Sequence, residues 1–325
     1  MPTTQAAAMT NHGASREHFE KVIHYLANGE LVPLLGAGVN VCDRQAAEVY
    51  EQGRNLPSGS ELSELLASEY AYPADRTDRK DLIRVAQFAQ AQLRHSDEEH
   101  RLRDTLHRVF RAQYGPTSVH RFLAGVPGRT SAHVLVLTTN YDDALEQAFD
   151  DAGEPYSVIF YRASRQGRCW LRHGEETEAK VIARPERYTG VSLHERSVIL
   201  KVHGAVDRRE RRSFNDSYVV SEDHYIDFLA STRLETLVPK GLLVPLLNSA
   251  LLFLGYRLRD WNLRVILHEL WNSRDFEYPA WAVHRDVDEV DAAIWRSRNV
   301  SLFDVELCAY VEELSARLGD GLYAA

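Results

Sequence analysis

Short apolar segments alternate with helical patterns over most of this 325-residue chain, and this alternation constrains the fold more than any other feature. Parallel strands need long crossover connections, which are usually helices, so the alternation is typical of a parallel sheet. The segments that read as buried strands are residues 31–35, 134–137, 198–202, 250–254, 280–283 and 300–303. The sequence therefore predicts an α/β fold, in which a parallel sheet carries helices on both faces.

The first predicted strand, residues 31–35, follows a helical pattern and ends at a glycine. The apolar residues of 19–26 repeat at helical spacing, and Asn28-Gly29 is a stop signal for that helix. Pro33 lies inside the strand and can donate no hydrogen bond to a neighbouring strand. Residues 31–35 are still predicted to form a strand, although the proline argues against a fully paired position in the centre of the sheet.

The next part of the chain, residues 41–128, carries mainly helical patterns and no convincing strand. These patterns lie at residues 61–70, 81–93, 98–114 and near His120. We therefore expect a helical lobe of residues 41–128 inserted into a sheet domain of residues 1–40 and 129–325. A second irregular segment, about residues 155–195, contains a strand-like stretch at 156–161 and several arginines.

Composition and charge exclude several classes of function. A net charge of -9 and a pI near 5.9 argue against direct binding of nucleic acid, which needs a dominant positive face. The first 14 residues contain no apolar run flanked by basic residues, so we expect no signal peptide and a cytoplasmic protein. The most apolar stretch, residues 242–256, is interrupted by polar residues and is shorter than the ~20 residues of a membrane span.

Cysteine spacing indicates neither disulfides nor metal. Cys42, Cys169 and Cys308 are scattered, and no CxxC pair is present. Structural zinc sites usually show paired ligands at short spacing. We therefore expect buried thiols and no bound metal.

Two loops that follow predicted strands contain residues suited to ligand binding. In Gly36-Ala37-Gly38-Val39-Asn40, two glycines allow a tight turn through which backbone N–H groups can approach a pyrophosphate. The third glycine of the dinucleotide fingerprint is absent, so a plain strand-to-helix turn remains an alternative. In Thr138-Thr139-Asn140-Tyr141-Asp142, Asn140 could instead cap a helix whose first turn contains Asp142.

Two further loops follow later strands. His203 ends the strand at 198–202, and histidine is the side chain best suited to accept a proton near neutral pH. Most single histidines are structural, however, and this chain has 14. Gly255-Tyr256 follows the strand at 250–254 and could contact the adenosine side of a dinucleotide. In the alternative without a ligand, this loop has a structural role only: Asp260 caps the next helix and Trp261 packs beside it.

The four loops together, in this order, resemble the sirtuin-like (SIR2-like) family over roughly residues 31–262. The local sequences are most similar to those of the sirtuin-like domains of prokaryotic antiphage defence. Residues 56–59, 218–225 and 253–262 share this similarity. The resemblance implies a Rossmann-like NAD site with a helical lobe closing over it. It implies that Asn140 holds the water or ribose, that Asp142 faces nicotinamide and that His203 is the base. It also implies that Gly36 and Gly38 line the pyrophosphate. The other residues that it places around NAD are Ala37, Asn40, Thr139, Gly255 and Tyr256.

Two departures separate the chain from the deacylating sirtuins. Thr139 precedes Asn140 where those enzymes usually carry glutamine, and no four-cysteine zinc module follows His203-Gly204. An arginine-rich stretch, residues 208–212, stands there instead and reads as a solvated loop or a contact surface. The resemblance therefore implies an NAD glycohydrolase that releases nicotinamide and ADP-ribose, linear or cyclised. The alternatives are an NAD-dependent protein deacylase and a non-catalytic sensor of NAD or ADP-ribose.

The same resemblance implies how such an activity would be controlled. An enzyme that destroyed NAD freely would poison its own cell, so activity must wait for a signal. A chain of this size resembles the subunit of defence systems that pairs with a HerA-type ATPase, with an Argonaute-type protein as the second choice of partner. We therefore expect a homo-oligomeric antiphage effector that depends on a separately encoded partner.

Overall fold

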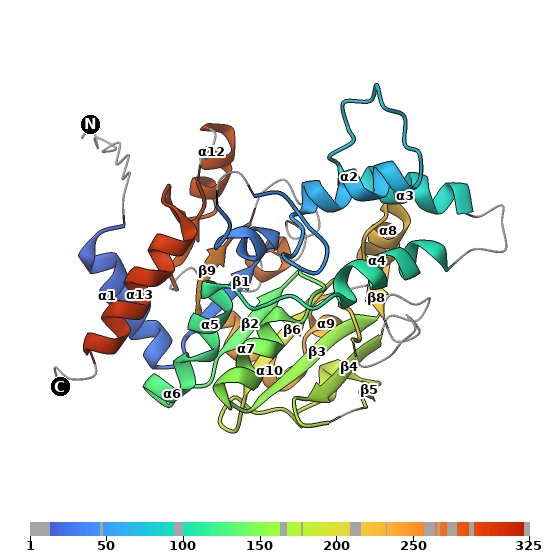
Figure 1. Ribbon diagram of the computed structural model, residues 1–325. Coiled ribbons are helices and arrows are strands. Elements are labelled where there is room, and N and C mark those ends of the chain that lie inside the picture. Colours follow the sequence, from blue (N-terminus) through green and yellow to red (C-terminus); the bar gives the residue numbers. More distant parts are fainter. Residues whose placement is uncertain are drawn as a thin grey trace, which may run out of the picture.

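A nine-stranded mixed sheet forms the centre of the computed structural model and confirms the predicted α/β fold (Figure 1). In sheet order its strands are β11 (Val300–Phe303), β10 (Ala280–Val283), β9 (Ala250–Leu254), β1 (Leu31–Leu35), β2 (Leu135–Thr138), β6 (Ser197–Lys201), β3 (Tyr156–Arg162), β4 (Arg168–His173) and β5 (Lys180–Ile182). From β11 to β3 neighbouring strands are parallel, whereas β4 and β5 add an antiparallel edge. All six predicted strands are present, each within one residue of its predicted bounds.

The structure describes residues 14–45, 48–93, 100–162, 168–176, 178–208, 216–231, 233–256, 264, 267–271, 278–285 and 289–321. Several residues singled out in the sequence lie outside these ranges, namely Arg165, Asp260, Trp261 and the arginines of 209–212. Within these ranges, no helix combines the length and apolar character that crossing a membrane requires.

The first strand is central, which corrects the argument from Pro33. β1 pairs with β9 along all of Leu31–Leu35, but its recorded pairing with β2 starts only at Leu34. The ladder on the β2 side therefore begins after the proline, so the missing N–H group does not keep β1 from the middle of the sheet.

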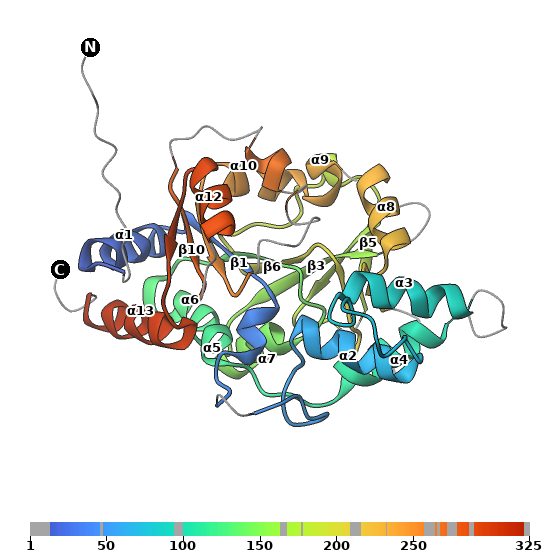
Figure 2. The same cartoon turned by 90° about the horizontal axis from the view of Figure 1, so that it is seen from above.

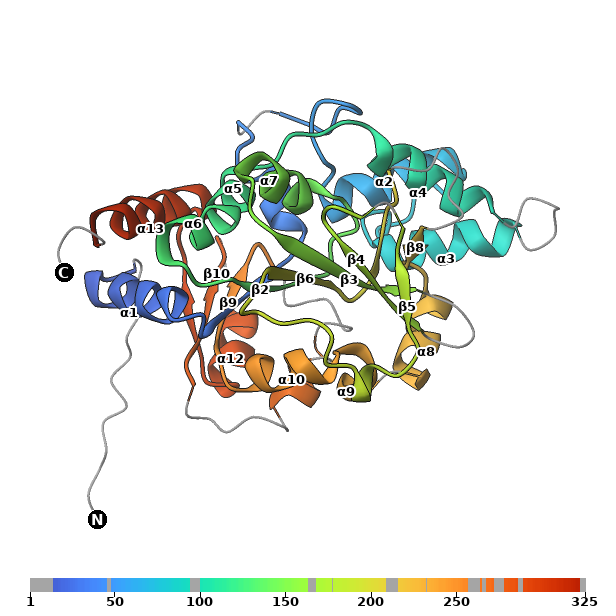
Figure 3. The same ribbon diagram turned by 90° about the horizontal axis from the view of Figure 1, so that it is seen from below.

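Helices cover both faces of the sheet, as Figures 2 and 3 show from opposite sides. One face carries α1 (Arg16–Ala27), α5 (Ser118–Ala124), α6 (Val126–Thr130), α7 (Ala144–Ala152) and α13 (Leu307–Gly321). The other carries α8 (Glu222–Ser231), α9 (Leu234–Leu237), α10 (Lys240–Leu247) and α12 (Glu289–Ser297). Leu31 and Leu35 pack against the first group, whereas Val32 and Leu34 pack against the second. Burial on both faces explains why these strands are continuously apolar.

The helical lobe packs around an apolar cluster that also contains Tyr141, Ala144, Val206, Tyr218 and Val220 from outside the lobe. Its helices α2 (Gly59–Glu69), α3 (Leu82–Leu93) and α4 (Arg101–Arg111) lie beyond the strand ends, to the right in Figure 1. α2 begins at a capping box, in which the Ser58 hydroxyl and the Glu61 carboxylate bind each other's backbone N–H groups. α5 and α6 instead share the cluster of α1, α7 and α13. The predicted lobe boundary at residue 128 stays a prediction.

The remaining short elements connect these layers. They are the 3-10 helices η1 (Ala37–Val41) and η2 (Pro185–Arg187), and a two-stranded antiparallel pair, β7 (Gly204–Ala205) with β8 (Ser217–Tyr218). The apolar stretch at 242–256 is divided between the end of α10, which contains Pro245, and β9.

Candidate functional site

The four predicted loops lie side by side at one edge of the sheet. Leu254, Leu35, Thr138 and Lys201 are in register across β9, β1, β2 and β6. The loop that follows each of these strands therefore begins at the same edge. The chain first builds the sheet from β1 toward β2 and later returns to add β9 on the other side of β1. Such a topological switch point is where open α/β sheets bind their ligands.

Three glycines bring the ends of β1 and β9 into backbone contact. The Gly36 N–H donates to the Leu254 carbonyl at 3.0 Å, and the Gly38 N–H donates to the Gly255 carbonyl at 2.9 Å. A Cβ atom on Gly38 would lie 2.6 Å from the Gly255 oxygen, and one on Gly36 would lie 2.7 Å from it. Gly255 itself has a φ of +67°, a conformation that favours glycine. The N–H groups of Gly36 and Gly38 therefore bind the last residue of β9 and the glycine that follows it, and the pyrophosphate role of this loop stays a prediction.

A buried amide–carboxylate network joins the loops after β1 and β2. The Asn140 Nδ2 donates to the Gly36 carbonyl at 3.2 Å and to the Asn40 Oδ1 at 3.4 Å. The Asn40 Nδ2 in turn donates to the Asp142 Oδ2 at 2.8 Å. Asn40, Asn140 and Asp142 are all buried. The network fixes the orientation of the Asn140 amide.

The Asn140 loop does not use its amide as a helix cap. The N-cap of α7 is Asp143, and the Asp142 Oδ1 accepts a hydrogen bond from the Ala144 N–H at 3.2 Å. The Thr138 hydroxyl donates to the Leu35 carbonyl and accepts from the Asn140 N–H, at 2.9 and 3.0 Å. These bonds hold the loop against β1, so the capping alternative for Asn140 is wrong.

A buried ion pair supports the same loop, which follows β2. This pair was not predicted from the sequence. The Lys201 Nζ lies 2.6 Å from the Glu146 Oε1, with both side chains almost fully enclosed. The same ammonium donates to the Asp142 carbonyl. Burial raises the pKa of Glu146, and the Lys201 charge opposes that shift. Only the position of Lys201 before His203 was available as a signal in the sequence.

His203 follows β6 and lies under α8. Its side chain is buried, with its ring edge-on to Tyr225 and Phe228 of α8 at centroid distances of 5.6 and 5.8 Å. The following Gly204 has a φ of +95°, and a Cβ there would lie 2.1 Å from the Ser217 carbonyl oxygen. This glycine therefore allows β8 to approach closely. Thr139 and Tyr256 also stand at this edge, and the Tyr256 ring packs edge-on against Phe253.

The helical lobe also contacts β8 and the residues on either side of it, which precede α8. Tyr141 donates to the Val219 carbonyl at 2.7 Å, and its ring packs against Phe110 of α4. The His107 Nδ1, also on α4, lies 2.7 Å from the Asp216 Oδ2, which accepts from the Tyr218 hydroxyl as well. These contacts join the lobe to β8, next to the site.

A second attachment of the lobe runs from α3 to α8, and Figure 2 shows these helices beside each other. Arg84 forms an ion pair with Glu222 at 2.8 Å. The side-chain Oε1 of Gln87 accepts a hydrogen bond from the Asp223 N–H at 3.0 Å. α3 of the lobe is therefore attached to α8, which carries the two rings that pack on His203.

Comparison with known proteins was informative at the level of families. The model of the SIR2-like domain matches residues 134–303, which run from β2 to β11 and contain Asn140, Asp142, His203 and Gly255. No curated protein matches the chain. Among solved structures, a chain described under "Structural Basis for the Mechanism and Regulation of Sir2 Enzymes" is 9% identical, with a TM-score of 0.38. That similarity covers 95% of this chain and 100% of the other.

Proposed function

Because the chain belongs to the SIR2-like domain family, we propose that it cleaves the bond between nicotinamide and ribose in NAD, releasing nicotinamide and ADP-ribose. One observation carries this proposal within the chain: the buried Asn40–Asn140–Asp142 network follows β1 and β2, and His203 follows the neighbouring strand β6 at the same edge of the sheet. An amide, a carboxylate and an imidazole at a ligand-binding edge suit hydrolysis better than binding alone, since binding needs no base.

The chemistry asks little acid catalysis of the protein. Nicotinamide leaves as a neutral molecule from a cationic ring, so the main needs are a placed nucleophile, a proton acceptor and support for an oxocarbenium-like ribose. The Nδ2 bonds of Asn140 leave its Oδ1 to accept a hydrogen bond from the water or a ribose hydroxyl. Asp142 supplies negative charge toward the nicotinamide side, and His203 accepts the proton.

The burial of His203 adds a requirement for movement. NAD reaches the imidazole only when α8 and the attached lobe shift, because Tyr225 and Phe228 enclose the ring. We therefore propose that the lobe opens to admit NAD and closes over it during cleavage.

The decisive experiment incubates the purified protein with NAD, with and without an acylated peptide, and separates the products. A glycohydrolase consumes NAD without the peptide, a deacylase needs the peptide, and a sensor binds NAD without consuming it. We expect Asn140→Ala and His203→Ala each to abolish NAD consumption, whereas His194→Ala, at an exposed histidine, keeps it. Near wild-type consumption by either folded site variant would remove that residue from the mechanism.

We also propose a biological role and a means of control. NAD hydrolysis that is restrained until infection would make this chain an antiphage effector, active as a homo-oligomer in the cytoplasm with a HerA-type ATPase partner. An Argonaute-type partner is the second choice. The coupling of the lobe to α8 supports this proposal, because a partner bound to the lobe could shift access to His203. A monomer that consumes NAD at full rate and is not stimulated by either partner would contradict it.

A further inference from the structure

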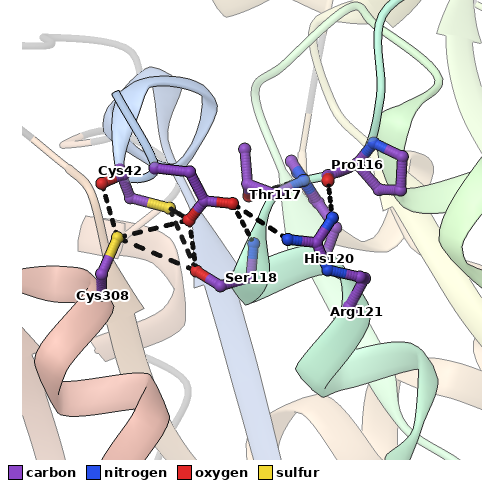
Figure 4. Close-up of polar contacts among 8 residues, drawn as sticks. Cys42, Pro116, Thr117, Ser118, His120, Arg121 and Cys308 are labelled. Atoms are coloured by element: carbon purple, nitrogen blue, oxygen red, sulfur yellow. Dashed lines mark hydrogen bonds and ion pairs between the residues drawn. The ribbon is translucent and has the colours of Figure 1, made fainter. Parts of the chain in front are cut away.

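Two cysteines that are distant in the sequence meet at the end of η1. Cys42 follows η1, and Cys308 lies in the first turn of α13 (Figure 4). The Cys308 thiol donates to the Cys42 carbonyl at 2.5 Å. Both sulfur atoms and a carboxylate oxygen of Asp43 lie within 4.8 Å of one another. Among the described residues, this is the one group of three or more side chains of metal-ligating type so placed.

The spacing of these atoms fits a tetrahedral zinc ion. The Asp43 Oδ1 lies 3.3 Å from the Cys42 sulfur and 3.4 Å from the Cys308 sulfur. With Zn–S bonds of about 2.3 Å and Zn–O bonds of about 2.0 Å, a tetrahedron places sulfur and oxygen ligands roughly 3.5 Å apart. Both sulfur–oxygen distances therefore match those of a tetrahedral zinc site, and the two sulfur atoms lie within 4.8 Å of each other.

The second carboxylate oxygen of Asp43 is hydrogen-bonded by protein groups. This is usual for the oxygen of a ligating carboxylate that does not bind the metal. The Asp43 Oδ2 accepts from the Ser118 N–H at 2.8 Å and forms an ion pair with Arg121 at 3.1 Å. A zinc ion with two thiolates and one carboxylate carries a net charge of -1, which the Arg121 guanidinium balances. The Ser118 hydroxyl lies 2.6 Å from the Asp43 Oδ1, too close for both oxygens to be ligands, so a water completes the tetrahedron.

We propose that Cys42, Asp43 and Cys308 form a zinc site that fastens α13 to the end of the glycine loop. Zinc binding displaces one proton from each thiol, leaving two thiolate ligands. This site differs from the zinc module sought in the sequence, because its cysteines come from opposite ends of the described chain. The expectation of a protein without bound metal is the alternative to this site.

Cobalt provides a direct test, because tetrahedral Co²⁺ with thiolate ligands has intense charge-transfer and visible bands. Protein stripped with a chelator, under a thiol-free reductant, is titrated with Co²⁺ and then with Zn²⁺. We expect one Co²⁺ per chain with both sets of bands, which Zn²⁺ then removes. Cys42→Ser and Cys308→Ser should each weaken binding at least tenfold, whereas Cys169→Ser should not, because Cys169 lies in a separate cluster.

The wild-type titration alone can overturn the site. Absence of the charge-transfer band in the reduced wild-type protein would exclude it, as would full band intensity in Cys308→Ser. A Cys42–Cys308 disulfide in protein purified without reductant, with no zinc retained after reduction, would show that the pair serves oxidation instead. None of these readouts depends on NAD, so the zinc site and the proposed hydrolase activity are tested separately.

Discussion

The contact between Gly38 and Gly255 shows how single residues set the geometry of the site. Their backbones approach so closely that a methyl group on Gly38 would meet the Gly255 oxygen at 2.6 Å and its Cα at 2.7 Å. The atoms in the way belong to the backbone, which cannot rotate aside as a side chain would. The glycines are therefore explained by this contact even before any ligand is considered.

We predict that Gly38→Ala lowers the free energy of unfolding by about 1–3 kcal/mol, the usual cost of forcing extra atoms into a packed site. It should also reduce NAD consumption, because the ends of β1 and β9 must separate. Gly319→Ala is the matched control, since a Cβ on this exposed glycine of α13 meets nothing within 4 Å. The control should be neutral or slightly stabilising. Equal denaturation midpoints for Gly38→Ala and the wild type would show that the close contact between Gly38 and Gly255 does not limit the size of this residue.

At the scale of elements, prediction succeeded where both faces of a strand are buried. The strands β1, β9 and β10 are continuous apolar runs buried along their whole length, and they were predicted at their observed bounds. β11 was also predicted at its observed bounds, although its Ser301 is polar and exposed. β4 was missed, since it alternates buried Cys169 and Leu171 with partly exposed residues in an arginine-rich stretch. Its pairing partner β3, and not its composition, makes it a strand.

The packing of α1 on α13 leads to a dependence on pH. Burial lowers the pKa of His18 to about 4, and its Nε2 lies 2.8 Å from the Tyr310 hydroxyl. In the unfolded chain the pKa is near 6.5, so between pH 6.5 and 4 the unfolded state binds a proton that the folded state does not. The stability present above pH 6.5 is therefore lost as the pH falls toward 4, by up to about 3 kcal/mol.

Chemical denaturation at several pH values checks this prediction. His18→Gln should show a shallower loss of unfolding free energy between pH 6.5 and 4 than the wild type. His24→Gln, at an exposed position of the same helix, should follow the wild-type curve. Parallel curves for the wild type and His18→Gln would assign the acid sensitivity to other groups.

At the scale of the whole molecule, part of the site followed from topology and part did not. Loops after parallel strands share one edge, so the convergence of the residues around Asn140 and His203 could be predicted from the sequence. Contacts such as Lys201 with Glu146, or Cys42 with Cys308, leave no signal, because no spacing rule relates residues on separate elements. The roles of the predicted site residues toward NAD stay predictions.

The attachment of the lobe gives a prediction about dynamics. Asp216 is buried and accepts from His107, Tyr218 and the Asp207 N–H. In Asp216→Ala these donors lose their acceptor, so hydrogen–deuterium exchange should increase in α4 and β8. Exchange in α1 and α13, which lie on the far side of the sheet domain, should stay unchanged and serves as the internal control. A uniform increase over all helices would indicate general destabilisation rather than release of the lobe.

The pairing of β1 with β9 also determines when the site can form during synthesis. Residues 31–35 leave the ribosome long before their partners on one side, which are residues 250–254. Until those partners emerge, Gly36 and Gly38 have no carbonyl groups of Leu254 and Gly255 to bind, and one wall of the switch point is missing. A partly synthesised chain therefore holds β1, β2 and β6 without a complete binding edge. The long interval between the two strands delays any ligand chemistry until residue 255 has been synthesised.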